Sequence, residues 1–331
     1  FVLVLENEDY NTTFAATPPP SPYLATTLPS LGRLLTHYYG IGHNSLGNYV
    51  AMVSGQAPNP LTQGDCPVYA DFLGAATDAD GQAVGQGCVY PRGVQTIGDQ
   101  LAAAGRTWRV YAEDMAGNPA APAACRHPPL NGRDQWQGGD PNDQYATRHV
   151  PFVYFHSVVD DQASCEAHVV DLGLLPGDLA SAATTPDYAF IVPDVCSDGH
   201  DDPCASPRQK GGYAGIDEFL RAWVPRILGS AAYQRDGLLV VTFDEAEASA
   251  PEACCGEPAG PNGPQPGITG PGGGRTGAVL LSPCLDPGTV DDTPHNHYSL
   301  LRTTEDVWGL PHLGYAGKAG LQPIGLGRCA P

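Results

Sequence analysis

The sequence predicts an α/β protein, a three-layer sandwich in which helices cover both faces of a mainly parallel central sheet. Continuous apolar runs bounded by polar loops recur along the chain, as is typical of strands buried on both faces. Amphipathic segments long enough to cross over between parallel strands lie between these runs. No internal repeat, heptad pattern or linker divides the 331 residues. We therefore expect a single domain over residues 1–331.

Each predicted element follows from its pattern of apolar residues. In chain order, the predicted strands are Phe1–Leu5, Trp108–Ala112, Pro151–Phe155, Tyr188–Val192, Gly237–Phe243 and Gly277–Leu281. The predicted helices, which have helical apolar spacing, are Ser30–Tyr38, Asn48–Ser54, Val94–Ala104, Tyr213–Leu228 and Ser299–Trp308. Two long segments, 57–91 and 246–274, lack such patterns and are predicted to be irregular functional loops.

Charge and composition exclude several classes of protein. Sixteen Lys and Arg against 36 Asp and Glu give a net charge of −20, which repels nucleic acid and anionic membrane surfaces. We therefore expect no nucleic-acid partner. No stretch approaches the roughly 18 consecutive apolar residues of a transmembrane helix, so we also expect no stable membrane insertion. The sequence does not predict an oligomeric state.

Ten cysteines in Gly-, Pro- and Asp-rich loops, without a repeated CxxC, indicate disulfides and an oxidising compartment. We expect a secreted or periplasmic protein whose signal peptide is not in this chain, because FVLVL at the start lacks a basic region. Local pairs would join Cys66 with Cys88, Cys125 with Cys165, and Cys196 with Cys204, although sequence alone does not fix connectivity. The adjacent Cys254 and Cys255 pair either with each other or with Cys284 and Cys329.

Acidic and amide residues follow two of the predicted strands directly. Glu6 and Asn7 follow the first strand, and Asp244 and Glu245 follow the fifth. Ligands bind at the carboxyl ends of strands in open α/β sheets, and three crowded carboxylates require a neutralising cation. Oxygen ligands favour Ca²⁺, Mg²⁺ or Mn²⁺, and Zn²⁺ also accepts carboxylates. The alternative is that these acids face solvent or cap helices.

Ser45 lies in the segment GHNSLGNYVAMVSG, before a predicted helix whose amino end would bind an anion. A metal could activate its hydroxyl without a histidine base, whereas ordinary helix capping is the alternative. His149, His200 and His297 lie beside predicted strand ends or a helix start, where imidazole can contact phosphate or protonate a leaving group. Motifs of serine hydrolases, zincins, P-loop enzymes and dinucleotide-binding proteins are absent.

Seven blocks, in order, resemble the bacterial phosphoesterase family, which includes secreted acid phosphatases and phospholipases C within the alkaline phosphatase superfamily. They begin with ENEDY and GHNSLGNYVAMVSG and continue with RHVPFVYF, FIVPDVCSDGH, LLVVTFDE, GGGRTGAVLLSP and PHNHYSLLRTTEDVWGLPHLGYA. Together they extend from Phe1 to about Ala316. The resemblance implies an alkaline phosphatase-like fold. ENEDY and a serine nucleophile, where many phospholipase C relatives have ENHxF and threonine, favour the acid phosphatase branch.

The resemblance also implies roles for individual residues. One divalent metal ion would be bound by Glu6, Asn7, Asp244 and Glu245, with Ser45 as nucleophile and further ligand. Asn48 would contact the phosphate, and the pocket would be lined by His149, Asp198, His200 and His297. The implied reaction hydrolyses a small phosphate monoester through a phosphoserine on Ser45, with His200 or His297 protonating the leaving group. A phospholipase C-like phosphodiesterase and a noncatalytic secreted binding protein are the alternatives.

Overall fold

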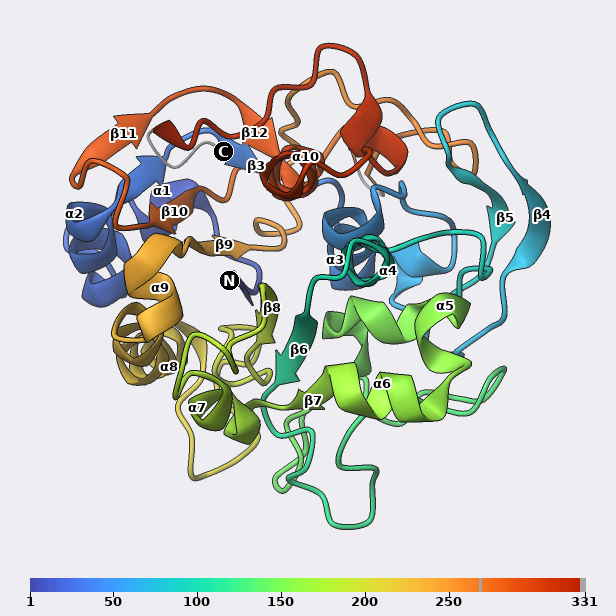
Figure 1. The fold of residues 1–331 in the computed structure, drawn as a ribbon, viewed down its shortest axis with the longest axis horizontal. Coiled ribbons are helices and arrows are strands. Elements are labelled where there is room, and N and C mark those ends of the chain that lie inside the picture. The colour runs from blue at the N-terminus through green and yellow to red at the C-terminus, as the bar shows by residue number, and fades with distance from the viewer. Residues whose placement is uncertain (268–269, 328–331) are drawn as a thin grey trace.

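The computed structural model describes residues 1–267 and 270–327. A sheet of eight strands forms its centre, and Figure 1 shows how the other elements surround this sheet. Their spatial order is β11-β2-β10-β9-β1-β8-β6-β7. Their bounds are β1 Val2–Leu5, β2 Arg33–Leu35, β6 Trp108–Ala112, β7 Val169–Asp171, β8 Tyr188–Val192, β9 Leu239–Phe243, β10 Ala278–Leu281 and β11 Thr289–Asp291. All neighbouring pairs are parallel except the two that β10 makes, so the predicted mainly parallel sheet is confirmed.

Helices pack on both faces of this sheet (Figure 1). Alternate residues of each strand point to opposite faces, so Val2 and Val4 of β1 join one core while Leu3 and Leu5 join the other. The first core contains α3 (Ser45–Ser54), α4 (Ile97–Ala103) and α10 (His297–Trp308); the second contains α7 (Leu175–Asp178), α8 (Gly212–Leu228) and α9 (Ala231–Asp236). The remaining α-helices are α1 Tyr10–Thr13, α2 Leu28–Leu31, α5 His156–Val159 and α6 Gln162–His168. The sheet and the helices on its two faces form the three predicted layers.

Two predicted elements are wrong. The apolar run Pro151–Phe155 is not a strand, because Pro151–Tyr154 forms a 3-10 helix with the proline in its first turn, where its missing N–H costs nothing. The helix predicted over Ser30–Tyr38 is replaced by the end of α2, strand β2 and the two-residue strand β3 (Tyr38–Tyr39). β2 pairs with β10 on one side and β11 on the other, and this pairing overrides the local helical spacing.

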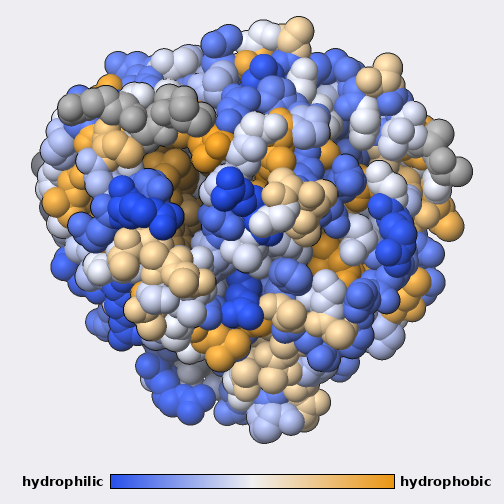
Figure 2. All heavy atoms as spheres, viewed as in Figure 1, coloured by the Kyte–Doolittle hydropathy of each residue, from blue (hydrophilic) through white to orange (hydrophobic). Residues whose placement is uncertain are grey.

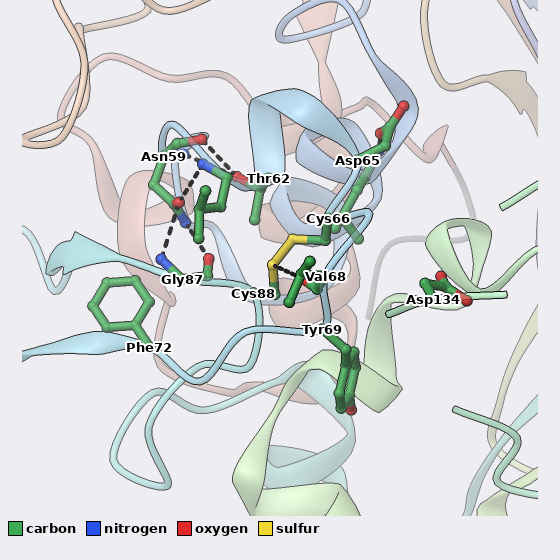
Figure 3. The surroundings of a disulfide bond; sticks show 12 residues. Asn59, Thr62, Asp65, Cys66, Val68, Tyr69, Phe72, Gly87, Cys88 and Asp134 are labelled. Carbon is green, nitrogen blue, oxygen red and sulfur yellow. Dashed lines mark hydrogen bonds between the residues drawn. A yellow bond between two sulfur atoms is a disulfide. The ribbon is translucent and has the colours of Figure 1, made fainter. Parts of the chain in front are cut away.

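The segment 57–91 is more ordered than predicted. It contains a 3-10 turn at Thr62–Gly64 and an antiparallel pair formed by β4 (Leu73–Thr77) and β5 (Ala83–Gln86). The Cys66–Cys88 disulfide closes this segment (Figure 3). The described part of 246–274 contains no helix or strand, as predicted.

The three local disulfides, Cys66–Cys88, Cys125–Cys165 and Cys196–Cys204, are confirmed. Of the two possibilities for the adjacent cysteines, the structure has Cys254 bonded to Cys255. Cys284 is also disulfide-bonded, and Cys329 lies outside the described residues. Covalent closure of several loops is typical of proteins in oxidising compartments.

Over the described residues, we find no helix that combines the length and apolar character needed to cross a bilayer. The face in Figure 2 carries its apolar residues in small groups separated by polar ones. Most of the apolar side chains are instead buried in the two cores beside the sheet.

Phe190 of β8 is the core residue with the clearest link to the site described below. Its ring is fully buried and packs edge-on against Tyr49 of α3 and against Phe152. We expect Phe190→Ala to lower the free energy of unfolding by about 3–5 kcal/mol, because it leaves a cavity among these rings. Urea denaturation checks this, and Phe190→Leu, which keeps most of the volume, should cost clearly less. Equal costs for both variants would contradict the packing described.

Candidate active site

Three strands bring acidic residues to one edge of the sheet. β1 pairs in parallel with both β8 and β9, so the carboxyl ends of the three strands are adjacent. Glu6 follows β1, Asp244 follows β9, and Asp198 lies in the loop after β8. The Glu6 N–H donates to the Asp198 carbonyl at 3.0 Å, and the Asp244 N–H donates to the Leu5 carbonyl at 2.9 Å. Backbone bonds thus hold the three acids at the edge where α/β sheets bind ligands.

Helix α3 presents its first turn to Glu6. The Ser45 hydroxyl, at the first position of the helix, donates to Glu6 Oε2 at 2.9 Å. The Tyr49 hydroxyl, one turn later and therefore on the same face, donates to Glu6 Oε1. The helix ends at Gly55, with φ of 67°, where a Cβ would lie 2.2 Å from the Leu313 carbonyl oxygen, so only glycine fits. Ser45 and Glu6, 39 residues apart in sequence, are therefore in direct contact.

Asn7 and Asp244 complete an oxygen-rich group around Glu6. Asn7 has φ of 59°, a conformation that asparagine tolerates, and its backbone N–H donates to Asp244 Oδ1 at 3.4 Å. The end of its side-chain amide lies 3.2 Å from both Glu6 Oε2 and Asp244 Oδ1. This arrangement is satisfied either by the amide nitrogen facing the two carboxylates or by a cation held among three oxygens.

His149 and Asp198 lie on the other side of Glu6. The imidazole Nε2 is 3.5 Å from Glu6 Oε1, and Nδ1 is 3.2 Å from Asp198 Oδ2. The ring stacks on Tyr49, with centroids 5.4 Å apart. Glu6, His149 and Asp198 each offer a ligand atom within 4.8 Å of the others. They form a second candidate set of metal ligands. It shares Glu6 with the first set, which consists of the oxygen-bearing side chains of Glu6, Asn7, Asp244 and Ser45.

Glu6, Asn7, Ser45, His149, Asp198 and Asp244 together form the cluster described here. Burial sets the protonation of its titratable side chains when no cation is bound. Loss of solvation raises the pKa of Glu6, Asp198 and Asp244, and the proximity of Glu6 raises the last two further. Burial also lowers the pKa of His149 well below its usual value, and the Arg148 charge adds to this effect. A neutral imidazole among crowded carboxyls is a weakly stabilised arrangement without a cation.

The side chains present fit a divalent cation. Within the described part of the chain, buried polar atoms of the cluster have no hydrogen-bond partner, namely both ring nitrogens of His149, Asp198 Oδ2 and Asp244 Oδ2. Buried polar groups are otherwise almost always satisfied. Carboxylate, amide, hydroxyl and imidazole donors together suit Ca²⁺, Mg²⁺, Mn²⁺ or Zn²⁺. We therefore describe the cluster as a candidate metal centre.

Two other residues predicted at the metal or the phosphate, Glu245 and Asn48, contact each other. Glu245 Oε2 is 3.4 Å from both His43 Nδ1 and Asn48 Nδ2, and burial raises the pKa of this carboxyl to about 7. The Asn48 amide accepts the N–H groups of Ile41 and Gly42 and donates to the Gly42 carbonyl. Asn48 thus holds the loop that precedes Ser45.

His297 and His200 occupy different positions relative to the cluster. Both ring nitrogens of the buried His297 contact the protein, Nδ1 with the Tyr38 hydroxyl at 3.0 Å and Nε2 with the Asp244 carbonyl oxygen. Burial lowers its pKa to about 4, and both ring nitrogens are already engaged within the protein. His200 lies at the exposed side, and its ring is 5.9 Å from that of His149.

Sequence reasoning missed four residues beside the cluster. They are His43, Tyr49, Asp65 and Arg148. Tyr49 and His43 lie within the block GHNSLGNYVAMVSG and contact Glu6 and Glu245. Of the four, Arg148 could have been found from the sequence. It directly precedes His149, a residue predicted to line a phosphate site, and arginine is a common phosphate-binding residue. Asp65 gave no signal in sequence.

A cavity of about 470 Å³ lies elsewhere, at the amino ends of the strands. Its walls include Phe1, Leu238 and Trp308 and none of the residues of the cluster. We therefore place the candidate site by its side-chain chemistry, at the opposite end of the sheet.

Ser45, at the amino end of α3, thus contacts a carboxylate of the candidate metal centre. The chain belongs to the Phosphoesterase family, which matches residues 24–311. It is 29% identical to a phosphate-repressible acid phosphatase of Penicillium chrysogenum, over 86% of this chain and 53% of that one. It is 25% identical to a phosphatidylinositol-3-phosphatase of Mycobacterium tuberculosis, over 88% and 72%. The relatives thus include fungal proteins as well as a bacterial one.

The chain spans little more than half the length of several acid phosphatases that it matches. Its fold is similar to that of an alkaline phosphatase superfamily protein from Vibrio parahaemolyticus, with a TM-score of 0.55 and 12% identity, covering 98% of this chain and 70% of that chain. This likeness confirms the predicted alkaline phosphatase-like fold.

Proposed function

We propose that the protein is a metal-dependent phosphomonoesterase of the acid phosphatase type that acts through a phosphoserine on Ser45. The observation that carries this proposal is the contact of the Ser45 hydroxyl with Glu6, inside a buried group of acids at the carboxyl edge of the sheet. Membership of the Phosphoesterase family and similarity to proteins named acid phosphatases support it.

One divalent ion would be held by Glu6, Asn7 and Asp244, with the Ser45 hydroxyl as a further ligand. Glu245, next to Asp244 in the chain, would be another ligand, and the set formed by Glu6, His149 and Asp198 is the alternative location. When bound, the ion would lower the pKa of the Ser45 hydroxyl and offset the charge that develops on the phosphoryl oxygens.

The side chains of this protein would then perform two displacements at phosphorus. Ser45 Oγ loses its proton and bonds to phosphorus, the bond from phosphorus to the ester oxygen breaks, and that oxygen takes up a proton, so the alcohol leaves. Water next attacks the phosphoserine: its oxygen bonds to phosphorus, the bond from phosphorus to Ser45 Oγ breaks, and Oγ regains a proton, so inorganic phosphate and the free Ser45 hydroxyl result. Glu6 orients Ser45 through its hydrogen bond, and the Tyr49 hydroxyl, which donates to Glu6, keeps the carboxylate in place.

We further propose that the protein works outside the cytoplasm, in a secreted or periplasmic location. The disulfides Cys66–Cys88, Cys125–Cys165 and Cys196–Cys204 support this, because such bonds persist in oxidising compartments.

The experiment compares hydrolysis of an aryl phosphate monoester with that of the matched diester, with and without chelator, from acidic to neutral pH. We expect cleavage of the monoester that chelator removes and added metal restores. Preference for the diester would place the protein among phospholipase C-like phosphodiesterases. No turnover of either ester with metal supplied would contradict an enzymatic role and favour a binding protein.

A further inference from the structure

Arg148 is a buried cation next to the candidate metal centre that the mechanism above does not use. It lies in the 3-10 turn Thr147–His149, and its side chain is 6% exposed. Among the residues that the structure describes, the guanidinium has one hydrogen-bond partner, His200 Nε2 at 2.9 Å from Nη2, and one nearby carboxylate, Asp65 Oδ2 at 4.0 Å from Nε. Because a guanidinium has five N–H donors, several remain for another ligand.

The direction of the bond to His200 fixes the tautomer of that histidine. A guanidinium only donates, so His200 Nε2 must accept and carries no proton. The ring proton is then on Nδ1, which lies 2.8 Å from Asp201 Oδ1 and donates to it. Asp201, His200 and Arg148 therefore form a chain in which each group orients the next. In this arrangement Nε2 has no proton to give to a leaving group.

Asp65 connects Arg148 to the nucleophile. Its Oδ1 accepts the N–H of Leu46, the residue after Ser45, at 2.9 Å, while Oδ2 faces the guanidinium. Asp65 has φ of 55° and precedes Cys66, whose disulfide to Cys88 closes the segment; Figure 3 shows the Asp65 side chain directed away from that bond. The guanidinium is thus held beside the first turn of α3.

The charge of Arg148 also acts on the acids of the cluster. Burial is the main cause that raises the pKa of Glu6 and of Asp198, and the Arg148 charge opposes it in both. Arg148 is therefore within electrostatic range of the place where a phosphoryl group would contact Ser45.

We propose that Arg148 binds the phosphoryl group of the substrate and that Asp65 and His200 are positioning residues that aim it. This inference rests on the proposed function and adds how the protein recognises its substrate class. A guanidinium donates two parallel N–H bonds to two oxygens of one phosphoryl group. A monoester dianion offers three non-bridging oxygens and two charges, whereas a diester offers two oxygens and one charge. Both esters can accept the two N–H bonds, so Arg148 favours the monoester through its second negative charge.

The first test compares wild-type protein with Arg148→Ala and Arg148→Lys, and with Arg92→Ala, which removes an exposed arginine paired with Asp160. Calorimetry with inorganic phosphate should give a Kd that is about 10- to 100-fold weaker in Arg148→Ala, because charge-assisted hydrogen bonds are lost. Arg148→Lys should recover part of the affinity and Arg92→Ala should match wild type. Bound metal, measured by elemental analysis, should not change.

Kinetic measurements on the same variants should show that Arg148→Ala lowers kcat/KM more for the aryl monoester than for the diester. Unchanged phosphate affinity, or equal falls for the two esters in a variant with wild-type metal content, would overturn the inference. The two proposals fail separately: if wild type hydrolyses neither ester, the proposed function is wrong, and calorimetry still decides whether Arg148 binds phosphate.

A second pair of variants tests the role of His200. The side-chain oxygen of His200→Gln can accept from Arg148, whereas His200→Leu cannot. We expect His200→Gln to keep most of the phosphate affinity and His200→Leu to lose it. If both variants keep wild-type phosphate affinity and both show a steeper dependence of rate on leaving-group pKa, His200 is a general acid and its assignment as a positioning residue is wrong.

Discussion

Replacing Ser45 by alanine should lower kcat for a phosphate monoester by at least about 1,000-fold, because no other group can take its place in the displacement. Ser45 is 2% exposed and its hydroxyl donates to Glu6, so the variant loses one hydrogen bond and little packing. Stopped-assay kinetics with an aryl phosphate measures the effect, and circular dichroism confirms that the fold is retained.

Ser54→Ala is the matched control. Ser54 is the last residue of the same helix, is buried, and donates to the Val50 carbonyl at 2.7 Å, far from Glu6 along the helix. It should keep activity near wild type. If Ser45→Ala retained a tenth or more of the wild-type kcat, a serine nucleophile at this position would be excluded.

Glu6→Gln should lower both metal content and kcat, the latter by about 100- to 1,000-fold. Glu6 is the one residue that belongs to both candidate ligand sets, and its carboxylate contacts Ser45 and Tyr49. The amide keeps the shape and removes the charge. Elemental analysis after dialysis gives the metal content.

Thermal unfolding provides a readout for Glu6→Gln that does not depend on activity. A metal at about 100 times its Kd stabilises a folded protein by about 2.7 kcal/mol, so chelator should lower the Tm of wild type but not that of the variant. Glu305→Gln is the control, since Glu305 is equally buried and accepts the N–H of Leu313 outside the cluster. An identical chelator response in Glu6→Gln would contradict the assignment of Glu6 as a ligand.

The acidic residues at the sheet edge could be predicted because the end of a buried strand is visible in the sequence as the change from apolar to polar residues. Continuous apolar runs identify β1 and β9, and the polar residues that follow must lie at their carboxyl ends, so the proximity of Glu6 and Asp244 follows from parallel pairing. Its place before a predicted helix made Ser45 a candidate, the resemblance implied its role as nucleophile, and the structure places it against Glu6.

Other features depend on tertiary contacts that no local pattern encodes. Strand β2 has helical spacing in sequence, yet its backbone pairs with β10 and β11. The carboxyl of Asp65 meets Arg148 only because the chain after α3 folds back, with the disulfide of Cys66 closing that segment. The contact of the His200 ring with Arg148 joins residues that are 52 positions apart in sequence, so no local pattern could predict it.

The measurement that tests the central claim most directly is acid quenching of the enzyme during turnover of a phosphate monoester, followed by mass spectrometry of its peptides. We predict a phosphoryl group on Ser45 in the peptide that contains GHNSLGNY, present with metal and absent after chelation or in Ser45→Ala. Rapid turnover with Ser45 unmodified, under conditions in which a chemically phosphorylated serine standard survives the quench, would contradict the account.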